Sequence, residues 1–129
     1  MKVLLVEDDP ILIQMYQDEF KKSGIELVSA QEGKAGIIQA VKEMPDFILL
    51  DIMMGSVDGV TVFKHLKEMP ETKEIPVAFL TVVPEGVPQG LNKDSKILEG
   101  SVGYWSKDKY TPIQIVEMIK EYLSRNKTS

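Results

Sequence analysis

Polar and charged side chains follow four of the short apolar runs in this sequence. The acidic run Glu7-Asp8-Asp9 follows the first apolar run, Asp51 the third and Thr81 the fourth, and Lys107 stands two residues beyond the fifth. Carboxylates gathered at one place repel one another, so a proton or a cation must relieve them. Oxygen ligands without His or Cys nearby favour Mg²⁺, which takes one or two carboxylates, keeps waters and completes its shell with phosphate oxygens. These residue types therefore favour an Mg²⁺ site.

Each of these residues alone also has a purely structural interpretation. Asp9 precedes Pro10, so capping of a helix explains it equally well, and both interpretations stay open here. An Asp after a buried strand commonly forms a turn, a Thr commonly packs and a Lys is commonly solvated. Acids, a Thr and a Lys at the ends of four strands are much harder to obtain by chance, which favours a functional site.

Five short apolar runs are predicted to be the strands that position these residues, at 3–6, 27–30, 47–50, 77–80 and 102–105. The first, third and fourth are continuously apolar, which is typical of strands that helices cover on both faces. The carboxyl ends of parallel strands share one edge of a sheet. The acids, Thr81 and Lys107 are therefore expected to meet at that edge.

A helix is predicted at residues 10–23. Pro10 suits the first helical position and Gly24 a stop after the last one. Its apolar stripe predicts which side chains are buried. They are Ile11, Met15 and Phe20, with Leu12 and Tyr16 beside them.

Three further helices are predicted from punctuation and apolar spacing. Pro45 ends the second, Asp58 opens the third, which ends before Pro70, and the capping box Thr111-Pro112-Ile113-Gln114 opens the last. The expected buried faces are Ala35, Ile38 and Val41, then Val62, Phe63 and Leu66, then Ile115, Val116, Ile119, Tyr122 and Leu123.

The stretch 82–100 is rich in Gly and Pro, and we expect only a short helix after Pro88 that stops at Gly100. Residues 126–129 are expected to fray beyond a single domain at 1–125. Strands that alternate with helices predict an α/β fold. It is a doubly wound parallel sheet with right-handed crossovers and a site at the carboxyl ends of its strands.

Composition excludes several functional classes. The 129 residues carry a formal net charge of −5, which disfavours a surface that grips nucleic acid or anionic lipid. The chain has no cysteine, so disulfide scaffolds and cysteine nucleophiles are excluded and the cytoplasm is the expected compartment. No apolar run approaches the ~20 residues that cross a bilayer, so no membrane association is expected.

The motifs together resemble the receiver domain of two-component response regulators over the whole chain, in order. They are Val6-Glu7-Asp8-Asp9-Pro10, Leu50-Asp51-Ile52-Met53, Asp58-Gly59, Leu80-Thr81 and Tyr104-Trp105-Ser106-Lys107. The resemblance implies a flavodoxin-like sheet of order 2-1-3-4-5, and a stand-alone receiver whose downstream target stays unidentified. It also implies a module that is not an enzyme and promotes only its own phosphorylation and dephosphorylation.

The resemblance also implies roles for the acidic residues. Asp51 would accept a phosphoryl group from a sensor histidine kinase or a phosphotransfer protein. Asp8, Asp51 and the backbone carbonyl of Met53 would hold Mg²⁺, and Glu7 would assist through water. Lys107 would pair with a phosphoryl oxygen, because a carboxylate attacks a dianionic phosphoryl group only when charge is cancelled.

A conformational switch is implied as well. The Thr81 hydroxyl would bind another phosphoryl oxygen, and Tyr104 would rotate into the space that Thr81 leaves. Trp105 is expected to pack on the opposite face of the sheet by strand alternation. His65 is expected to be solvated surface rather than a phosphotransfer histidine.

The sequence departs from the family pattern at three positions, and those at Val82 and Asp108, with the Gly- and Pro-rich stretch after Thr81, favour an alternative, a pseudo-receiver that binds a partner constitutively without phosphorylation. Gly55 stands where a proline is usual, Val82 follows the Thr where a small residue is usual, and Asp108 follows the Lys in place of proline. With no proline there, the Lys107–Asp108 bond is predicted to be trans. An aspartyl phosphohydrolase is disfavoured because Met53 stands where its second Asp belongs, and a flavodoxin because acids open the first crossover.

Overall fold

The computed structural model describes residues 1–54, 58–81 and 100–125 of the chain. Its strands form one parallel sheet of order β2-β1-β3-β4-β5, as the family resemblance implies. The strands are β1 (Lys2–Val6), β2 (Glu26–Ala30), β3 (Phe47–Leu50), β4 (Val77–Thr81) and β5 (Gly103–Ser106). The order reverses beside β1, and this switch point is where such folds place their sites.

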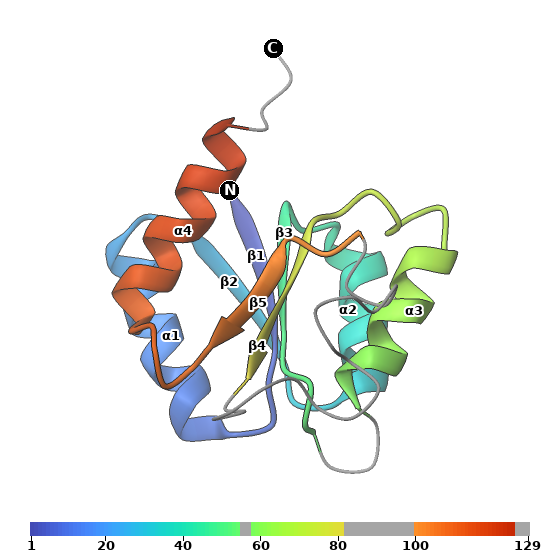
Figure 1. Cartoon of the computed structure of the whole chain (residues 1–129), viewed down its shortest axis with the longest axis horizontal. Helices are drawn as coiled ribbons and strands as arrows, with labels where there is room; N and C mark the ends of the chain where they lie inside the picture. Colours follow the sequence, from blue (N-terminus) through green and yellow to red (C-terminus); the bar gives the residue numbers. More distant parts are fainter. Residues whose placement is uncertain (55–57, 82–99, 126–129) are drawn as a thin grey trace.

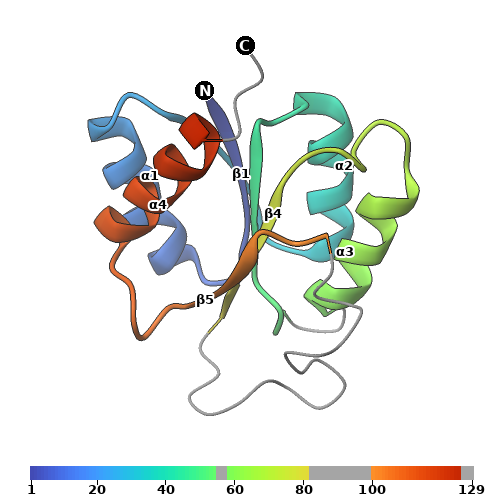
Figure 2. The same cartoon turned by 45° about the horizontal axis from the view of Figure 1, so that its top comes forward.

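Helices cover the sheet on both faces (Figures 1 and 2). They are α1 (Pro10–Lys22), α2 (Gly33–Glu43), α3 (Gly59–Glu68) and α4 (Pro112–Arg125). In both views α1 and α4 lie on one face and α2 and α3 on the other. This two-sided cover explains why β1 and β3 are almost continuously apolar and buried.

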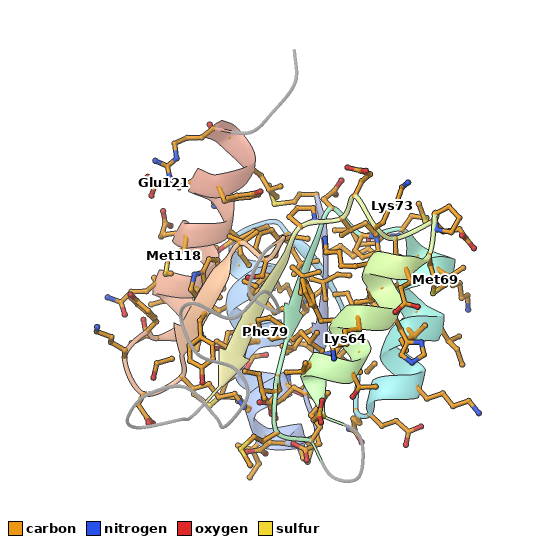
Figure 3. The ribbon with its side chains drawn as sticks, turned by 45° about the vertical axis from the view of Figure 1, so that its right-hand side comes forward. Lys64, Met69, Lys73, Phe79, Met118 and Glu121 are labelled. Atoms are coloured by element: carbon orange, nitrogen blue, oxygen red, sulfur yellow. The ribbon has the colours of Figure 1, made fainter. Side chains whose placement is uncertain are left out.

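Alternation along the strands divides the core into two clusters. Val3 and Leu5 of β1 face α1 and α4, whereas Leu4 and Val6 face α2 and α3. Phe79 of β4 lies in the second of these clusters, with its ring centroid 5.1 Å from that of Phe63. Figure 3 shows the contrast between Phe79, enclosed by the ribbon, and Lys64, Met69, Lys73 and Glu121 at the outside.

The predicted buried faces of α1 and α2 are partly wrong. In α1 the buried residues are Ile13, Tyr16 and Phe20, whereas Ile11 and Met15 are 73% and 49% exposed. In α2, Ile38 is exposed, and glycines and alanine make the contact instead, at Gly33, Gly36 and Ala40. A β-carbon at Gly36 would come 2.8 Å from Val6 Cγ2, so this small residue allows α2 to lie close to β1.

The predicted faces of α3 and α4 are confirmed. Val62, Phe63 and Leu66 are buried, and so are the core positions of α4, Ile115, Val116 and Ile119, with Tyr122 and Leu123 packed against the core. The capping box is reciprocal: Thr111 N donates to Gln114 Oε1 and Gln114 N donates to Thr111 Oγ1.

Several predicted boundaries shift by one residue. The last strand is Gly103–Ser106 rather than 102–105, although Val102 N still donates to Val77 O at 2.7 Å. The first helix ends at Lys22, and Gly24 follows it with φ +74°, as its predicted stop role requires. The short helix expected after Pro88 and the fraying expected at 126–129 lie outside the described residues. Among the described residues, no helix is long and apolar enough to span a membrane.

Candidate functional site

Strand register places Glu7 and Asp51 side by side at the carboxyl edge of the sheet. Val6 pairs with Leu50, so the residues that follow them leave neighbouring strands at the same level. Asp51 N donates to Val6 O at 3.0 Å, and Glu7 N donates to Ala30 O of β2 at 2.9 Å. Both side chains are almost fully buried, with Glu7 1% and Asp51 3% exposed. A buried carboxylate requires a partner, and two adjacent ones require a proton or a cation.

Lys107 supplies one positive charge to this pair. Its Nζ donates to Asp51 Oδ2 at 3.2 Å and forms an ion pair with Glu7 Oε1. Only 11% of the Lys107 side chain is exposed. The turn that follows β5 brings Lys107 into the site, because Lys109 N and Tyr110 N both donate to Ser106 O. One ammonium is therefore shared by two buried carboxylates from different strands.

Burial dominates the electrostatics of the site. It raises the pKa of Glu7 to about 7, with the nearby charge of Asp51 adding to the rise and Lys107 opposing it. Burial also raises the pKa of Asp51, again opposed by Lys107. For Lys107, burial lowers the pKa, but the bond to Glu7 and the charge of Asp51 outweigh it and leave the pKa raised. Lys107 thus relieves only part of the charge repulsion between the acids.

The acidic residues fit a divalent cation. Glu7, Asp8 and Asp51 each offer one carboxylate oxygen, and these oxygens lie within 4.8 Å of one another. Asp8 is exposed, so the cluster opens to solvent on one side. An all-oxygen donor set that leaves room for water is the kind that Mg²⁺ prefers. Three carboxylates against the single ammonium of Lys107 leave an excess of negative charge for such an ion to neutralise.

Asp9 belongs to the helix rather than to this cluster. Its Oδ1 accepts hydrogen bonds from Ile11 N at 2.9 Å and Leu12 N at 3.4 Å, so it is the N-cap of α1. Its own N–H donates to Glu7 Oε2 at 3.1 Å. The question that the sequence left open is thus answered in favour of capping.

Met53 follows the strand end that carries Asp51. Its N–H donates to Asp51 Oδ1 at 3.2 Å, which leaves Oδ2 for Lys107. Its side chain is 65% exposed at the mouth of the site. The expectation that its carbonyl oxygen binds the metal stays a prediction.

Gly59 has a role here that the sequence reasoning missed. Its N–H donates to Ile52 O at 2.7 Å, and a β-carbon at this position would overlap the carbonyl oxygen of Asp51. Asp58, just before it, caps α3 by accepting from Thr61 N. The sequence identifies the Asp58-Gly59 pair as a motif. Only the close approach of the backbone at Gly59 to that at Asp51 explains why the glycine is needed.

The two predicted switch residues are placed differently by the structure. Thr81 ends β4, where its backbone pairs with Ser106, but its side chain lies outside what the structure describes. Tyr104 lies half-buried against the core beneath α2 and α3, and its buried hydroxyl has no hydrogen-bond partner among the described residues. Burial raises the pKa of Tyr104. The switch itself therefore remains a prediction.

Three further expectations are confirmed. Trp105 packs on the opposite face from Tyr104, stacked on Phe47 with ring centroids 5.8 Å apart. His65 is exposed on α3. The Lys107–Asp108 bond is trans, since no cis peptide bond occurs in the described residues. The departures at Gly55 and Val82 lie outside those residues.

Comparisons with known proteins agree with this geometry. Residues 3–93 match the family model described as the response regulator receiver domain. The chain is 32% identical over 126 residues to the polar-differentiation response regulator DivK of Brucella anthropi, covering 94% of each protein. It is 33% identical over 82 residues to the response regulator PleD of Caulobacter vibrioides, which is 64% of this chain but only 18% of PleD.

Among solved structures, the chemotaxis protein CheY4 of Vibrio cholerae superposes with a TM-score of 0.79 at 25% identity, covering 93% of this chain and 96% of that one. The family match, the nearly full-length similarity to DivK and the sheet order agree with the acidic edge built from β1 and β3. The chain belongs to the response regulator receiver-domain family.

Proposed function

We propose that Asp51 accepts a phosphoryl group from a phosphohistidine of a sensor histidine kinase or a phosphotransfer protein. The observation that carries this proposal is the buried Asp51 carboxylate, bound to Lys107 and facing the carboxylates of Glu7 and Asp8. A nucleophile, a cation and room for a metal lie together at one edge of the sheet. A purely structural ion pair would not require the third carboxylate.

The transfer forms one bond and breaks one. An Asp51 oxygen attacks phosphorus, the P–N bond to the donor histidine breaks, and the ring nitrogen keeps the electron pair. The ring then takes one proton from water, so the products are an acyl phosphate on Asp51 and a neutral histidine on the donor. Mg²⁺ held by Asp8, Asp51 and the Met53 carbonyl would neutralise phosphoryl charge, with Glu7 acting through water.

Lys107 has a defined task in this proposal. In the resting chain it binds Asp51 Oδ2 and Glu7 Oε1. When the phosphoryl group arrives, Lys107 exchanges Asp51 for a phosphoryl oxygen and keeps Glu7 as its anchor. The Thr81 hydroxyl binds another phosphoryl oxygen, and Tyr104 then rotates towards Thr81 to change a partner-binding face.

Exposed apolar side chains near the site favour a protein as the donor. Ile11 and Met15 lie one turn apart on α1, Met53 lies two residues beyond Asp51, and Ile113 lies at the start of α4. Each of these side chains is about half exposed or more. A small phosphodonor gains no binding energy from these exposed apolar side chains, whereas a helix of a partner protein can cover them.

Intact-mass measurement after incubation with acetyl phosphate and Mg²⁺ tests the proposal. We expect the native chain to gain the mass of one phosphoryl group, and Asp51→Asn to gain none. Asp46→Asn is the matched control, because Asp46 precedes the same strand at the opposite edge of the sheet and should react normally. No gain by the native chain, even with a phosphohistidine protein donor, would support the pseudo-receiver alternative.

A further inference from the structure

We infer that Asp9 is a positioning residue: by capping α1, it fixes the backbone N–H that holds the Glu7 carboxylate in place. The inference rests on the proposed use of the acidic site and adds a residue to it. It assigns the third acid of the Glu7-Asp8-Asp9 run a role distinct from those of its two neighbours.

The carboxylate of Asp9 is engaged by the helix. Its Oδ1 accepts from the N–H groups of Ile11 and Leu12, and its carbonyl oxygen accepts from Ile13 N at 3.0 Å. The two bonds to the side chain satisfy N–H groups that the first turn of a helix otherwise leaves without partners, and the bond to the carbonyl oxygen is the first bond of the helix itself. The cluster of carboxylate oxygens that could hold a metal contains Glu7, Asp8 and Asp51, without Asp9.

The same residue is tied to the site through its backbone. Asp9 adopts φ −87° and ψ 109°, the extended conformation of an N-cap, and Pro10 favours this conformation in the residue that precedes it. In this conformation its N–H reaches Glu7 Oε2 at 3.1 Å. The side-chain cap and the bond to Glu7 therefore depend on one local backbone geometry.

The hydrogen bond from Asp9 N fixes the orientation of the Glu7 carboxylate. Glutamate has one more rotatable bond than aspartate, so its carboxylate must be held from both sides to stay in one orientation. Asp9 N holds Oε2, and Lys107 meets Oε1. With Glu7 fixed in this way, Lys107 stays shared between Glu7 and Asp51 rather than moving fully to Asp51.

The test compares two variants of the Asp9 cap with one variant of the cap of α4. Asp9→Ala removes the cap, whereas Asp9→Asn keeps an oxygen that can cap and loses only the charge. Thr111→Ala is the matched control, because Thr111 caps α4 and, within the part of the chain that the structure describes, forms no hydrogen bond with Glu7. Two quantities are measured: hydrogen exchange of the residue 9 amide by NMR in metal-free protein, and the Mg²⁺ concentration that gives half of the thermal stabilisation.

For Asp9→Ala we expect about fivefold faster exchange of that amide and about fivefold weaker Mg²⁺ stabilisation, the size that loss of a typical cap corresponds to. Asp9→Asn should stay within about twofold of the native chain in both. Thr111→Ala should lower the melting temperature as Asp9→Ala does, yet leave both quantities unchanged.

Three results would overturn the inference. The first is an unprotected residue 9 amide in the native chain, and the second is an Asp9→Ala chain that matches the native one. The third is an Asp9→Asn chain as impaired as Asp9→Ala, because charge rather than capping would then be responsible. If Mg²⁺ does not stabilise the native chain at all, the metal part of the proposed function fails, while amide exchange still decides the role of Asp9.

Discussion

Lys107 and Lys67 are both at least partly buried, at opposite edges of the same sheet, and their pKa values shift in opposite directions. Lys107 is bound by the carboxylates of Glu7 and Asp51. Lys67, near the end of α3, donates instead to the carbonyl oxygens of Lys73 at 3.1 Å and Ile75 at 3.0 Å. Burial lowers the pKa of Lys67, whereas for Lys107 the carboxylates outweigh burial and raise the pKa.

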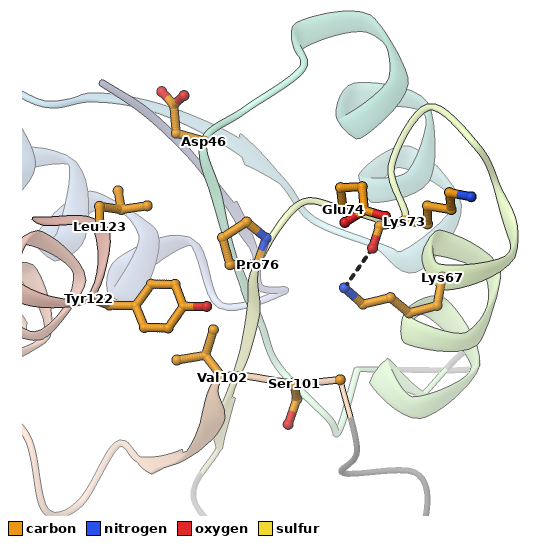
Figure 4. Close-up of a pocket in the computed structure, with 10 residues that line it drawn as sticks. Asp46, Lys67, Lys73, Glu74, Pro76, Ser101, Val102, Tyr122 and Leu123 are labelled. Carbon is orange, nitrogen blue, oxygen red and sulfur yellow. Dashed lines mark hydrogen bonds between the residues drawn. The ribbon is translucent and has the colours of Figure 1, made fainter. Parts of the chain in front are cut away.

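The surroundings of Lys67 are built mainly from neutral groups. Its Nζ lies 5.5 Å from the centroid of the Phe63 ring, and the bond to Lys73 closes the turn after α3 (Figure 4). An open pocket of about 650 Å³ lies beside it, and Lys67 and Tyr122 extend towards that pocket from α3 and α4. Here the lysine side chain stabilises the backbone between α3 and β4 by hydrogen bonds.

The groups that bind a lysine, rather than its burial, decide its chemical role. Neutral carbonyls satisfy the hydrogen-bond donors of Lys67 and add no negative charge, so its hydrogen bonds are made without a further ligand. At the other edge three carboxylates exceed the charge of Lys107, and this excess of negative charge favours the binding of a cation.

Replacing each lysine by methionine should separate the two roles most strongly. Lys107→Met leaves Glu7 and Asp51 buried without a cation, and we expect a loss of about 3–5 kcal/mol in the free energy of unfolding. Lys67→Met removes two bonds to neutral carbonyls and should cost only about 1–2 kcal/mol. Urea unfolding at neutral pH without Mg²⁺ measures both, and equal losses would contradict the comparison.

The dependence of stability on pH should also differ between the edges. The pKa of Glu7 is about 7 in the folded chain against an ordinary 4.5, so the folded state binds the proton more tightly. Stability should therefore fall as pH rises from 4.5 to about 7, by about 3 kcal/mol from this group. Glu7→Gln should flatten this fall, measured by urea unfolding across that range.

Lys67 supplies the control for that measurement. Its lowered pKa means that the unfolded chain holds the proton more tightly, so its contribution to stability rises with pH as pH approaches 10.5. Lys67→Met should thus change only the alkaline part of the profile. If Lys67→Met flattens the fall in stability between pH 4.5 and 7, Glu7 is not the source of that fall.

Mg²⁺ should stabilise the folded chain through the acidic residues Glu7, Asp8 and Asp51, and not through the surroundings of Lys67. An ion that binds only the folded chain adds about 1.4 kcal/mol to the free energy of unfolding at ten times its dissociation constant. We expect a rise in melting temperature in millimolar Mg²⁺ for the native chain and for Lys67→Met, and none for Asp8→Asn. If the native chain does not respond, the metal assignment of Glu7, Asp8 and Asp51 is wrong.

The smallest expected effect concerns the lifetime of the phosphorylated chain. Hydrolysis requires a water in line with phosphorus, and the exposed thioether of Met53 cannot orient one by a strong hydrogen bond. We therefore expect a long-lived acyl phosphate that Met53→Asn shortens about fivefold, or about 1 kcal/mol in the barrier. Ile113→Asn is the matched control at the same edge, and decay of phosphoprotein after donor removal is the measurement. Equal decay in the native and Met53→Asn chains would exclude this role.

Sequence patterns predicted the sheet and the meeting of its acids. Continuous apolar runs indicate strands buried on both faces, and parallel strands necessarily bring Glu7 and Asp51 to one edge. The resemblance to receiver domains added the sheet order, which periodicity alone does not contain. The buried faces of α3 and α4 were also predictable, because their apolar residues form one narrow stripe.

Other features depended on tertiary structure. Apolar residues surround much of α1, so only its placement against the sheet decides that Ile13 is buried and Ile11 exposed. The capping role of Asp9 depends on the backbone angle at which β1 passes into α1. The sharing of Lys107 between Glu7 and Asp51 depends on strand register and on the turn after β5. The residue types and their order along the chain thus determined which groups meet. Their orientation was set by packing between distant segments, which local sequence does not encode.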